Sequence, residues 1–280
     1  MERIKMSNIE GLDLNKKIED EIKQNNKGCI IRPSVAVIQI GDNELNDKHI
    51  KLKEEACNRV GIYFRYFKYD DNTPELTIVN KIKELNNDDY VNGIVIELPI
   101  PEKYNEKRLL NTILNTKDID GLTDINIGRL ISGRKTFTPC TVAAINTILK
   151  ENNIELEGKE VVIVGKGKLV GRPMIYQLLN AGATVTVCHS KTADLKKHTI
   201  DADIIISATG VKNLITADMV KDDVVVIDAG CGVEDGKIYT DVDAKVAKKA
   251  SLLTPKTGCI GPLTIAMFLK NTMISYNNKK

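Results

Sequence analysis

Over the first 110 residues, short runs of consecutive apolar residues alternate with longer segments that carry apolar residues at helical spacing. The segment SVAVIQI, residues 34–40, is almost continuously apolar and β-branched, which is typical of a strand buried on both faces. Residues 11–25 carry Leu and Ile at helical spacing among charged residues, which predicts an amphipathic helix. The full pattern predicts helices at 11–25, 44–59 and 73–85 and strands at 34–40, 62–69 and 93–98. Such alternation indicates a parallel α/β structure.

A second series of elements begins near residue 140. A helix is predicted at 141–149, strands at 161–164, 184–188, 203–207 and 224–228, and a further helix from 261. Residues 117–140 contain three glycines, a proline and no long period, so we predict a loop-rich connection or an active-site wall. The predicted fold class is α/β, with two domains and a cleft between them. Their predicted extents are 1–139, joined by a C-terminal helix at 262–280, and a doubly wound domain at 140–261.

Composition excludes several classes of protein. The 280 residues are 42% hydrophobic, and 40 basic residues face 38 acidic ones, so no charge excess points to nucleic acid or to a membrane surface. The N-terminal residues lack the apolar segment of a signal peptide, and no apolar run is long enough to span a bilayer. The six cysteines are far apart and no histidine lies near them at zinc-site spacing. We therefore expect a cytoplasmic protein with free thiols and no metal.

The stretch VVIVGKGKLVGRP, residues 161–173, combines a buried strand, a glycine-rich turn and the start of a helix. Gly165, Gly167 and Gly171 lie in the turn, where free backbone N–H groups and a helix N-terminus can hold a phosphate. The spacing differs from the usual dinucleotide fingerprint. A tight glycine turn without a ligand is therefore the alternative.

The end of the strand at 184–188 bears on the choice of dinucleotide. An NAD-binding unit usually places an acid there for the ribose 2′-hydroxyl, but this chain has His189, Ser190 and Lys191. Lys166 adds a second cation within the glycine turn. Two cations and a hydroxyl favour a 2′-phosphate, so we predict NADP; the alternative is that these lysines only face solvent.

Six blocks taken together are far more specific than the glycine turn. They are GIVIELPIP (93–101), KDIDGLTDINIGRL (117–130), TPCT (138–141), VGKGKLVGRP (164–173), CHSKTADL (188–195) and TPKTGCIGPLT (254–264). In this order and spacing, the chain resembles the bifunctional methylenetetrahydrofolate dehydrogenase/cyclohydrolase family over nearly its whole length. The resemblance implies a homodimeric cytoplasmic enzyme with a Rossmann-type NADP domain. It would oxidise 5,10-methylenetetrahydrofolate with NADP and hydrolyse the 5,10-methenyl product to 10-formyltetrahydrofolate.

The resemblance also implies site residues. Lys53 matches the family's catalytic lysine, and Asp120 matches the aspartate that holds the pterin ring. The catalytic candidates are Lys53, His49, Glu97 and Asp120. The further folate-binding candidates are Ile96, Leu98, Gly258, Cys259, Ile260, Gly261 and Pro262. The cofactor-binding candidates are Gly165, Lys166, Gly167, Val170, Gly171, Pro173, His189, Ser190, Lys191, Thr209, Gly210 and Cys231.

Two departures from the family lie beside Lys53. His49 stands where the family has tyrosine, and Glu97 stands where it has glutamine. We expect an ion pair between Glu97 and Lys53 that raises the pKa of the lysine. A lysine held cationic is a poor general base, so we expect the dehydrogenase to outpace the cyclohydrolase more than is usual for the family. Other departures are Lys166 and Gly167 for arginine and serine, Thr257-Gly258-Cys259 for Pro-Gly-Gly, and Cys231 for isoleucine.

Three other functions stay open at this point. The chain could be a dehydrogenase without hydrolase activity, or an NADP oxidoreductase of the same plan with a non-folate substrate. The altered residues at 49 and 97 also allow a non-catalytic folate or NADP sensor.

Overall fold

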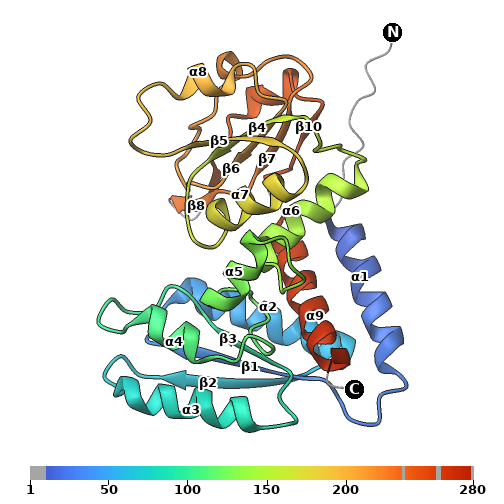
Figure 1. Cartoon of the computed structure of the whole chain (residues 1–280), viewed down its shortest axis with the longest axis vertical. Helices are drawn as coiled ribbons and strands as arrows, with labels where there is room; N and C mark the ends of the chain where they lie inside the picture. The colour runs from blue at the N-terminus through green and yellow to red at the C-terminus, as the bar shows by residue number, and fades with distance from the viewer. Residues whose placement is uncertain (1–10, 235–236, 257–259, 279–280) are drawn as a thin grey trace. The chain divides into compact units, whose positions relative to one another are not determined.

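The computed structural model describes residues 11–234, 237–256 and 260–278, which form two compact units. One unit consists of residues 14–140 and 263–278, and the other of residues 141–262 and 11–13 (Figure 1). The chain therefore leaves the first unit at residue 140 and returns to it at residue 263.

The first unit is built on a parallel three-stranded sheet in the order β2-β1-β3. The strands are β1 (Ser34–Ile40), β2 (Tyr63–Tyr69) and β3 (Gly93–Ile96). The helices are α1 (Gly11–Asn26), α2 (Glu44–Val60), α3 (Glu75–Asn87), α4 (Glu106–Thr112), α5 (Asp124–Ile131) and α9 (Ile260–Asn278), of which α1 and α9 extend into the second unit by a few residues.

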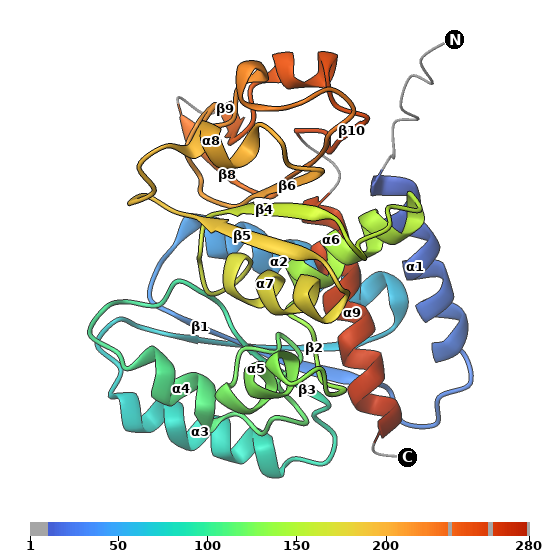
Figure 2. The ribbon, with the colours of Figure 1, turned by 45° about the horizontal axis from the view of Figure 1, so that its top comes forward.

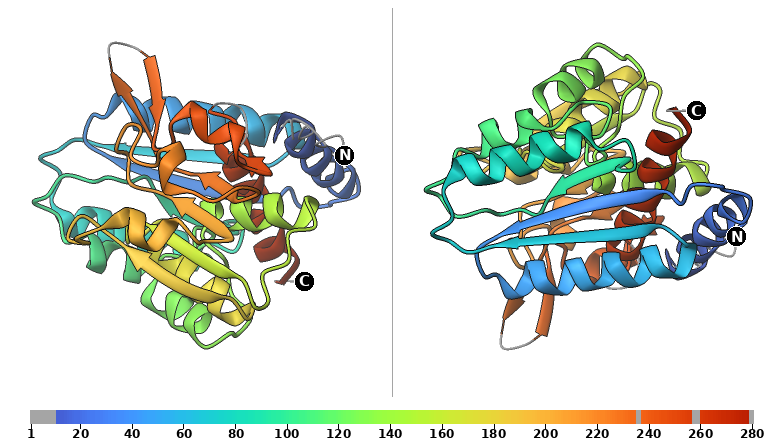
Figure 3. Two further views of the ribbon diagram at one scale, coloured as in Figure 1. Left: turned by 90° about the horizontal axis from the view of Figure 1, so that it is seen from above. Right: turned by 90° about the horizontal axis from the view of Figure 1, so that it is seen from below.

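Both faces of this sheet are covered, with α2 on one side and α3 and α4 on the other (Figure 3, right). Every residue of β1 is buried, as its almost continuously apolar sequence predicts. Ile38 and Ile94 pack in one cluster with Ile82 of α3 and Leu109 of α4. The sheet is thus a rigid support for the residues that follow its strands.

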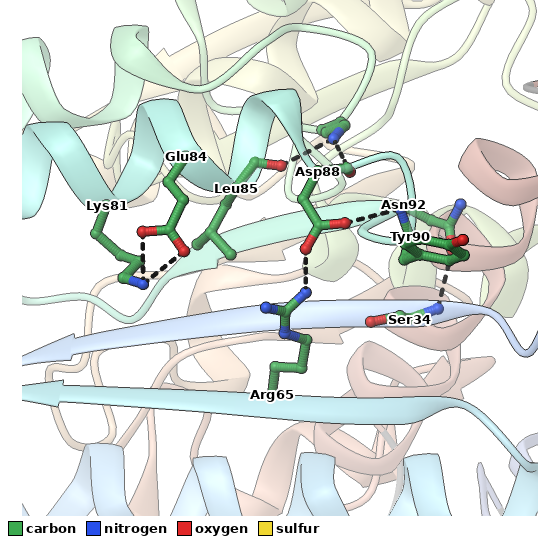
Figure 4. A network of polar contacts seen from close by, with 9 residues as sticks. Ser34, Arg65, Lys81, Glu84, Leu85, Asp88, Tyr90 and Asn92 are labelled. Carbon is green, nitrogen blue, oxygen red and sulfur yellow. Dashed lines mark hydrogen bonds and ion pairs between the residues drawn. The ribbon is translucent and has the colours of Figure 1, made fainter.

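A polar network holds the amino-terminal end of this sheet (Figure 4). Arg65 of β2 lies 2.6 Å from Asp88, which follows α3. The Asn92 side chain accepts the backbone N–H of Ser34 at 2.9 Å. The buried Lys117 ammonium donates to the carbonyls of Leu85 and Asp88. These contacts fix the strands at the end opposite to the one where the candidate site lies.

The second unit contains a parallel five-stranded sheet in the order β10-β7-β6-β4-β5. Helices α6 and α7 lie on one face, and α8 lies on the other (Figure 2). The strands are β4 (Glu160–Val164), β5 (Thr184–Cys188), β6 (Ile204–Ser207), β7 (Val225–Asp228) and β10 (Leu252–Leu253), and β8 (Cys231–Glu234) and β9 (Lys237–Thr240) form a separate antiparallel pair. The helices are α6 (Cys140–Glu151), α7 (Gly171–Asn180), α8 (Leu195–Thr199) and the 3-10 turns η1 (Ala217–Met219) and η2 (Ala244–Lys248).

The prediction for residues 117–140 is wrong in part, because α5 forms within this stretch. Thr123 caps α5 by accepting the N–H of Asn126, a signal that the sequence contained. The strand predicted at 93–98 ends at Ile96, and α4, β8, β9 and β10 were not predicted. In the parts of the chain that are described, no helix combines the length and apolar character that crossing a membrane requires.

Candidate active site

Lys53 lies on α2, whose start and end are both marked by the sequence. Asn43 accepts the N–H groups of Leu45 and Asn46, and Gly61 ends the helix with a φ of +82°. The Lys53 side chain is only 13% exposed, and its Nζ lies 2.7 Å from Oε2 of Glu97. The predicted ion pair between these two residues is therefore confirmed.

Glu97 follows directly after β3, at the carboxyl end of the sheet. Its N–H donates to the carbonyl of Ile38 at 2.8 Å, which anchors the backbone to β1. Its side chain is 5% exposed, and its second oxygen, Oε1, lies 3.8 Å from Nδ1 of His49. His49 precedes Lys53 by four residues on α2, so both side chains reach the same carboxylate from one helix face.

Two opposing effects act on the Lys53 ammonium. Burial lowers its pKa, but the negative charges of Glu97 and Asp120, together with the hydrogen bond to Glu97, raise it above its ordinary value. The ammonium also lies 5.4 Å from the centroid of the Phe268 ring, within the range of a cation–π contact. The predicted rise in the lysine pKa is confirmed, and Lys53 remains a cation near neutral pH.

His49 differs from its neighbours in exposure, since 55% of its side chain is accessible. Its pKa is lowered, first by the part of the ring that is buried and further by the Lys53 charge, against the opposing effect of Glu97. The imidazole is therefore neutral near pH 7, beside a lysine that is not.

The loop that carries Asp120 is held by its neighbours in sequence. The buried Asp118 carboxylate accepts the N–H groups of Leu122 and Thr123 and the side-chain amide of Asn126. Asp120, in contrast, accepts a contact from Sγ of Cys140 at 3.2 Å. Burial raises the pKa of Asp120 while Lys53 lowers it. Of the two aspartates in KDIDG, Asp118 shapes the loop and Asp120 lies in the electrostatic field of Lys53.

The other predicted folate contacts fall into three groups: two flank Glu97, three lie at the start of α9, and two lie outside the described residues. Ile96 and Leu98 flank Glu97, with Ile96 buried and Leu98 partly buried. Ile260, Gly261 and Pro262 form the first turn of α9 and not the loop before it. Gly258 and Cys259 lie outside the described residues.

The glycine-rich turn follows β4 at the point where the strand order reverses between β4 and β6. Gly165 has a φ of +106°, and a Cβ on it would meet the carbonyl of Ala208. A Cβ on Gly171 would collide with the carbonyl of Gly165, whereas one on Gly167 would meet nothing. Two of the three glycines are therefore required by the backbone, and Gly167 leaves open space. Val170 and Pro173 lie at the start of α7, where Val170 is partly exposed and Pro173 is buried.

The predicted cations lie at the same edge of the sheet. Lys166 is exposed within the glycine turn, and Ser190 and Lys191 are exposed directly after β5, which pairs with β4. The N–H of Lys191 donates to Nδ1 of His189 at 3.2 Å, which closes the turn. All three side chains are exposed, so a phosphate bound at this edge would displace no buried group.

A buried carboxylate joins the loops that follow β6 and β7. Oδ2 of Asp241 accepts the hydroxyls of Ser207 and Thr209 and the N–H of Thr209, all within 2.7 Å. A Cβ on Gly230 would overlap this same carboxylate. Asp241 thus fixes Thr209, Gly210 and the segment that leads to the exposed Cys231, which are three predicted cofactor contacts.

Two models of one protein family match the chain. The catalytic domain of tetrahydrofolate dehydrogenase/cyclohydrolase matches residues 9–120, and the NAD(P)-binding domain of the same enzyme matches residues 139–280. The bifunctional protein FolD of Nautilia profundicola is 42% identical, over 98% of both sequences. The chain belongs to the tetrahydrofolate dehydrogenase/cyclohydrolase family.

Solved structures of this family superpose closely. The FolD methylenetetrahydrofolate dehydrogenase/cyclohydrolase of Campylobacter jejuni is 43% identical, with a TM-score of 0.95 over 97% of this chain and 98% of its own. The Trypanosoma brucei enzyme, solved with NADP cofactor and an inhibitor, is 29% identical with a TM-score of 0.92 over 98% of each chain. The resemblance and the α/β fold class with an NAD(P)-binding second domain are confirmed.

Sequence reasoning missed the residues that support the tetrahydrofolate dehydrogenase/cyclohydrolase site from α6 and α9. Asn271 donates to the carbonyls of Ile119 and Thr138 and lies 3.8 Å from Sγ of Cys140. Burial and the Asp120 charge raise the pKa of Cys140 well above its ordinary value, so the thiol stays protonated. Cys140 and Asn271 therefore secure the loop on either side of Asp120. Cys140 lies in the TPCT block, but nothing in the sequence linked it to Asp120, and Asn271 stands in an apolar helix with no motif around it.

A hollow of about 400 Å³ lies elsewhere, at the amino-terminal edge of the second sheet. Two of its charged lining residues pair with each other, since Nζ of Lys221 lies 2.6 Å from Oδ1 of Asp203. Among the described residues, no group of three or more His, Cys, Asp or Glu side chains is placed to hold a metal ion.

Proposed function

We propose that the chain is a bifunctional enzyme of one-carbon folate metabolism. It oxidises 5,10-methylenetetrahydrofolate to the 5,10-methenyl form with NADP, and hydrolyses that product to 10-formyltetrahydrofolate. The observation that carries the proposal is the buried pair of Lys53 and Glu97, at 2.7 Å, with Asp120 close enough to act on the same ammonium. Full-length relatives named as bifunctional proteins support it.

We assign folate to residues 1–139 with 262–280, and NADP to residues 140–261. Asp120 has a carboxylate that can accept paired N–H groups from an amino-pyrimidine edge, the chemical signature of a pterin. Lys53 and Glu97 form a neutral pair, so the reacting carbon can become cationic beside them without meeting a net positive charge. Ile96, Leu98, Ile260, Gly261 and Pro262, with Gly258 and Cys259, complete the proposed folate set.

The residues at the switch point of the second sheet suit a dinucleotide. The nicotinamide, when bound, supplies the carbon that accepts a hydride. The N–H groups of the turn at Gly165–Gly167 would hold the pyrophosphate. Lys166, Ser190 and Lys191 would hold a 2′-phosphate, which favours NADP over NAD. The required glycines at 165 and 171 and the exposed cations support this placement.

Three further assignments belong to this proposal. A homodimer and a cytoplasmic location agree with the resemblance to the family, and the near-neutral balance of charges agrees with the absence of nucleic-acid and membrane partners. Size-exclusion chromatography with light scattering tests the dimer, and a molecular mass of one chain would contradict it.

The test of the activity follows both reactions with the purified chain. Methylenetetrahydrofolate is supplied with NADP and, separately, with NAD, and the reduced nicotinamide is measured. Methenyltetrahydrofolate is then supplied alone, and the loss of its absorbance is measured against the uncatalysed rate. Turnover in both assays supports the proposal, while folate binding without turnover would indicate a sensor.

The ion pair at Glu97 also favours a second candidate, an enzyme whose dehydrogenase outpaces its hydrolase. The carboxylate stabilises a cation that is the product of hydride transfer and the reactant of hydrolysis. Comparing kcat for the two reactions distinguishes this candidate from an evenly bifunctional enzyme.

A further inference from the structure

Hydrolysis of a methenyl group requires a group that takes a proton from water, and Lys53 is poorly suited to that task. Its ammonium lies 2.7 Å from the buried Glu97 and 5.4 Å from the Phe268 ring, and both contacts favour the charged form. A lysine that already holds its proton can donate a hydrogen bond, but it cannot act as a base.

The other titratable groups around Lys53 are also occupied. Cys140, at the start of α6, holds its proton and directs its Sγ at Asp120. Asp120 is committed to that contact and to the proposed pterin. Glu97, after β3, is committed to Lys53. Among the described groups of this cluster, His49 is the one that is both half exposed and neutral near pH 7.

His49 is oriented in a way that suits a base. Its Nδ1 faces Oε1 of Glu97 at 3.8 Å, which leaves Nε2 directed away from that carboxylate. The charged groups that act on the ring are Glu97, from the segment after β3, and Lys53, one turn further along α2. An imidazole whose one nitrogen faces a carboxylate while the other is free is the arrangement found in acid–base catalysis generally.

We propose that His49 is the general base of the hydrolysis, with Lys53 as a fixed cation that orients water. This proposal deepens the proposed function and rests on it. A water oxygen bonds to the bridging methenyl carbon while its proton passes to Nε2 of His49, which leaves a neutral carbinolamine and an imidazolium. The carbon–N5 bond then breaks, N5 takes the proton from His49, and the hydroxyl proton leaves to solvent as the formyl group forms.

The first experiment measures the pH dependence of kcat/KM for hydrolysis between pH 5 and 8, corrected for the uncatalysed rate. We expect a plateau at neutral pH and a tenfold fall per pH unit below the pKa of His49, which burial of part of the ring lowers from its ordinary value. His49→Gln should lose this acid limb and roughly 100-fold or more in rate, as removal of a general base typically does. Lys51→Gln, an exposed change on the same helix, is the matched control and should keep the profile.

The second experiment tests whether the acid limb of the kinetic pH profile reports the titration of His49. The chain has three histidines, so NMR titration can follow each imidazole, and the His49→Gln spectrum identifies His49. The pKa of His49 should match the kinetic limb, and both should fall together in Glu97→Gln, because Glu97 raises that pKa. A limb that persists in His49→Gln, or a kinetic pKa that does not follow His49, would overturn the proposal. An inactive dehydrogenase in the unaltered chain would instead contradict the proposed function.

Discussion

Two aspartates, two residues apart, show how neighbours decide the use of identical side chains. The Asp118 carboxylate accepts hydrogen bonds from Leu122, Thr123 and Asn126, and these bonds hold the loop in shape. Asp120 receives a thiol contact from Cys140 and feels the Lys53 charge. The sequence could not separate these roles from spacing, because both residues fall in one turn; the resemblance to the family did so.

Asp120→Asn should weaken folate binding and leave NADP binding nearly unchanged. Losing one charge-assisted hydrogen bond costs roughly 1.5–3 kcal/mol, or about 10- to 100-fold in Kd. Titration of a folate ligand measures the loss. Asp118→Asn is the informative comparison, because it should lower the midpoint of thermal unfolding instead. Unchanged folate affinity in Asp120→Asn would remove the proposed pterin contact.

Glu97→Gln should raise the rate of hydrolysis relative to hydride transfer. The amide removes the negative charge that stabilises the methenyl cation, which is the reactant of hydrolysis. The ratio of the two kcat values, measured in one buffer, reports the change. A ratio that stays the same or moves toward the dehydrogenase would contradict the role given to this carboxylate.

Lys166→Ala should lower the affinity for NADP by roughly one to two orders of magnitude, since one charge-assisted contact is worth about 1.5–3 kcal/mol. The affinity for NAD, which lacks the 2′-phosphate, should change much less. Isothermal titration with both dinucleotides provides the measurement. Lys168→Ala, two residues further along the same exposed turn, is the matched control. Equal losses for NADP and NAD would show that Lys166 does not contact the 2′-phosphate.

At the scale of elements, the strands were the most predictable part. The strands β1 and β6 are fully buried. The observed bounds lie within one residue of the expected ones for β1, β2, β4, β5, β6 and β7. The helix α5 was missed because Gly121 and Gly128 suggested a loop, although Gly128 lies inside the helix. The pair β8 and β9 was missed because two four-residue strands leave almost no period to detect.

The buried Asp241 carboxylate contacts the loops that follow β6 and β7, and its replacement tests whether these contacts position the cofactor site. Asp241→Asn should weaken the binding of NADP and NAD alike. The change disturbs the loops after β6 and β7 but leaves the 2′-phosphate contacts intact. Each lost buried hydrogen bond to a charge is worth roughly 1.5–3 kcal/mol. Asp203→Asn, at the opposite end of the same sheet, is the control and should lower stability without a change in cofactor affinity. A loss confined to NADP would contradict this view.

At the scale of the whole molecule, the alternation of strands and helices predicted the fold class. The same pattern did not predict which residues the side chains of α9 contact. Phe268, Asn271 and Ser275 belong to an apolar helix whose pattern says nothing about their partners. Those partners, Lys53, Ile119 and Asn92, are far away in sequence. Only the three-dimensional structure reveals such contacts.

NADP should protect the two units unequally. Ligand at 100 times Kd stabilises the bound form by about 2.7 kcal/mol. Amide hydrogen exchange should therefore slow most in the turn at 165–171 and in residues 208–210 and 229–232. The strands of the first sheet should change least. Equal slowing in both sheets would argue against an NADP site confined to residues 140–261.

The split course of the chain has a consequence for its synthesis. Residues 14–140 leave the ribosome first, but the helix that closes their unit, at residues 263–278, follows only after residues 141–262 have been made. At roughly 5–20 residues per second, that interval lasts on the order of ten seconds. Only then can the Ser275 hydroxyl and the Asn271 amide donate hydrogen bonds to the carbonyls of Asn92 and Ile119. The unit that is translated in between can thus complete its fold before the one that was started earlier.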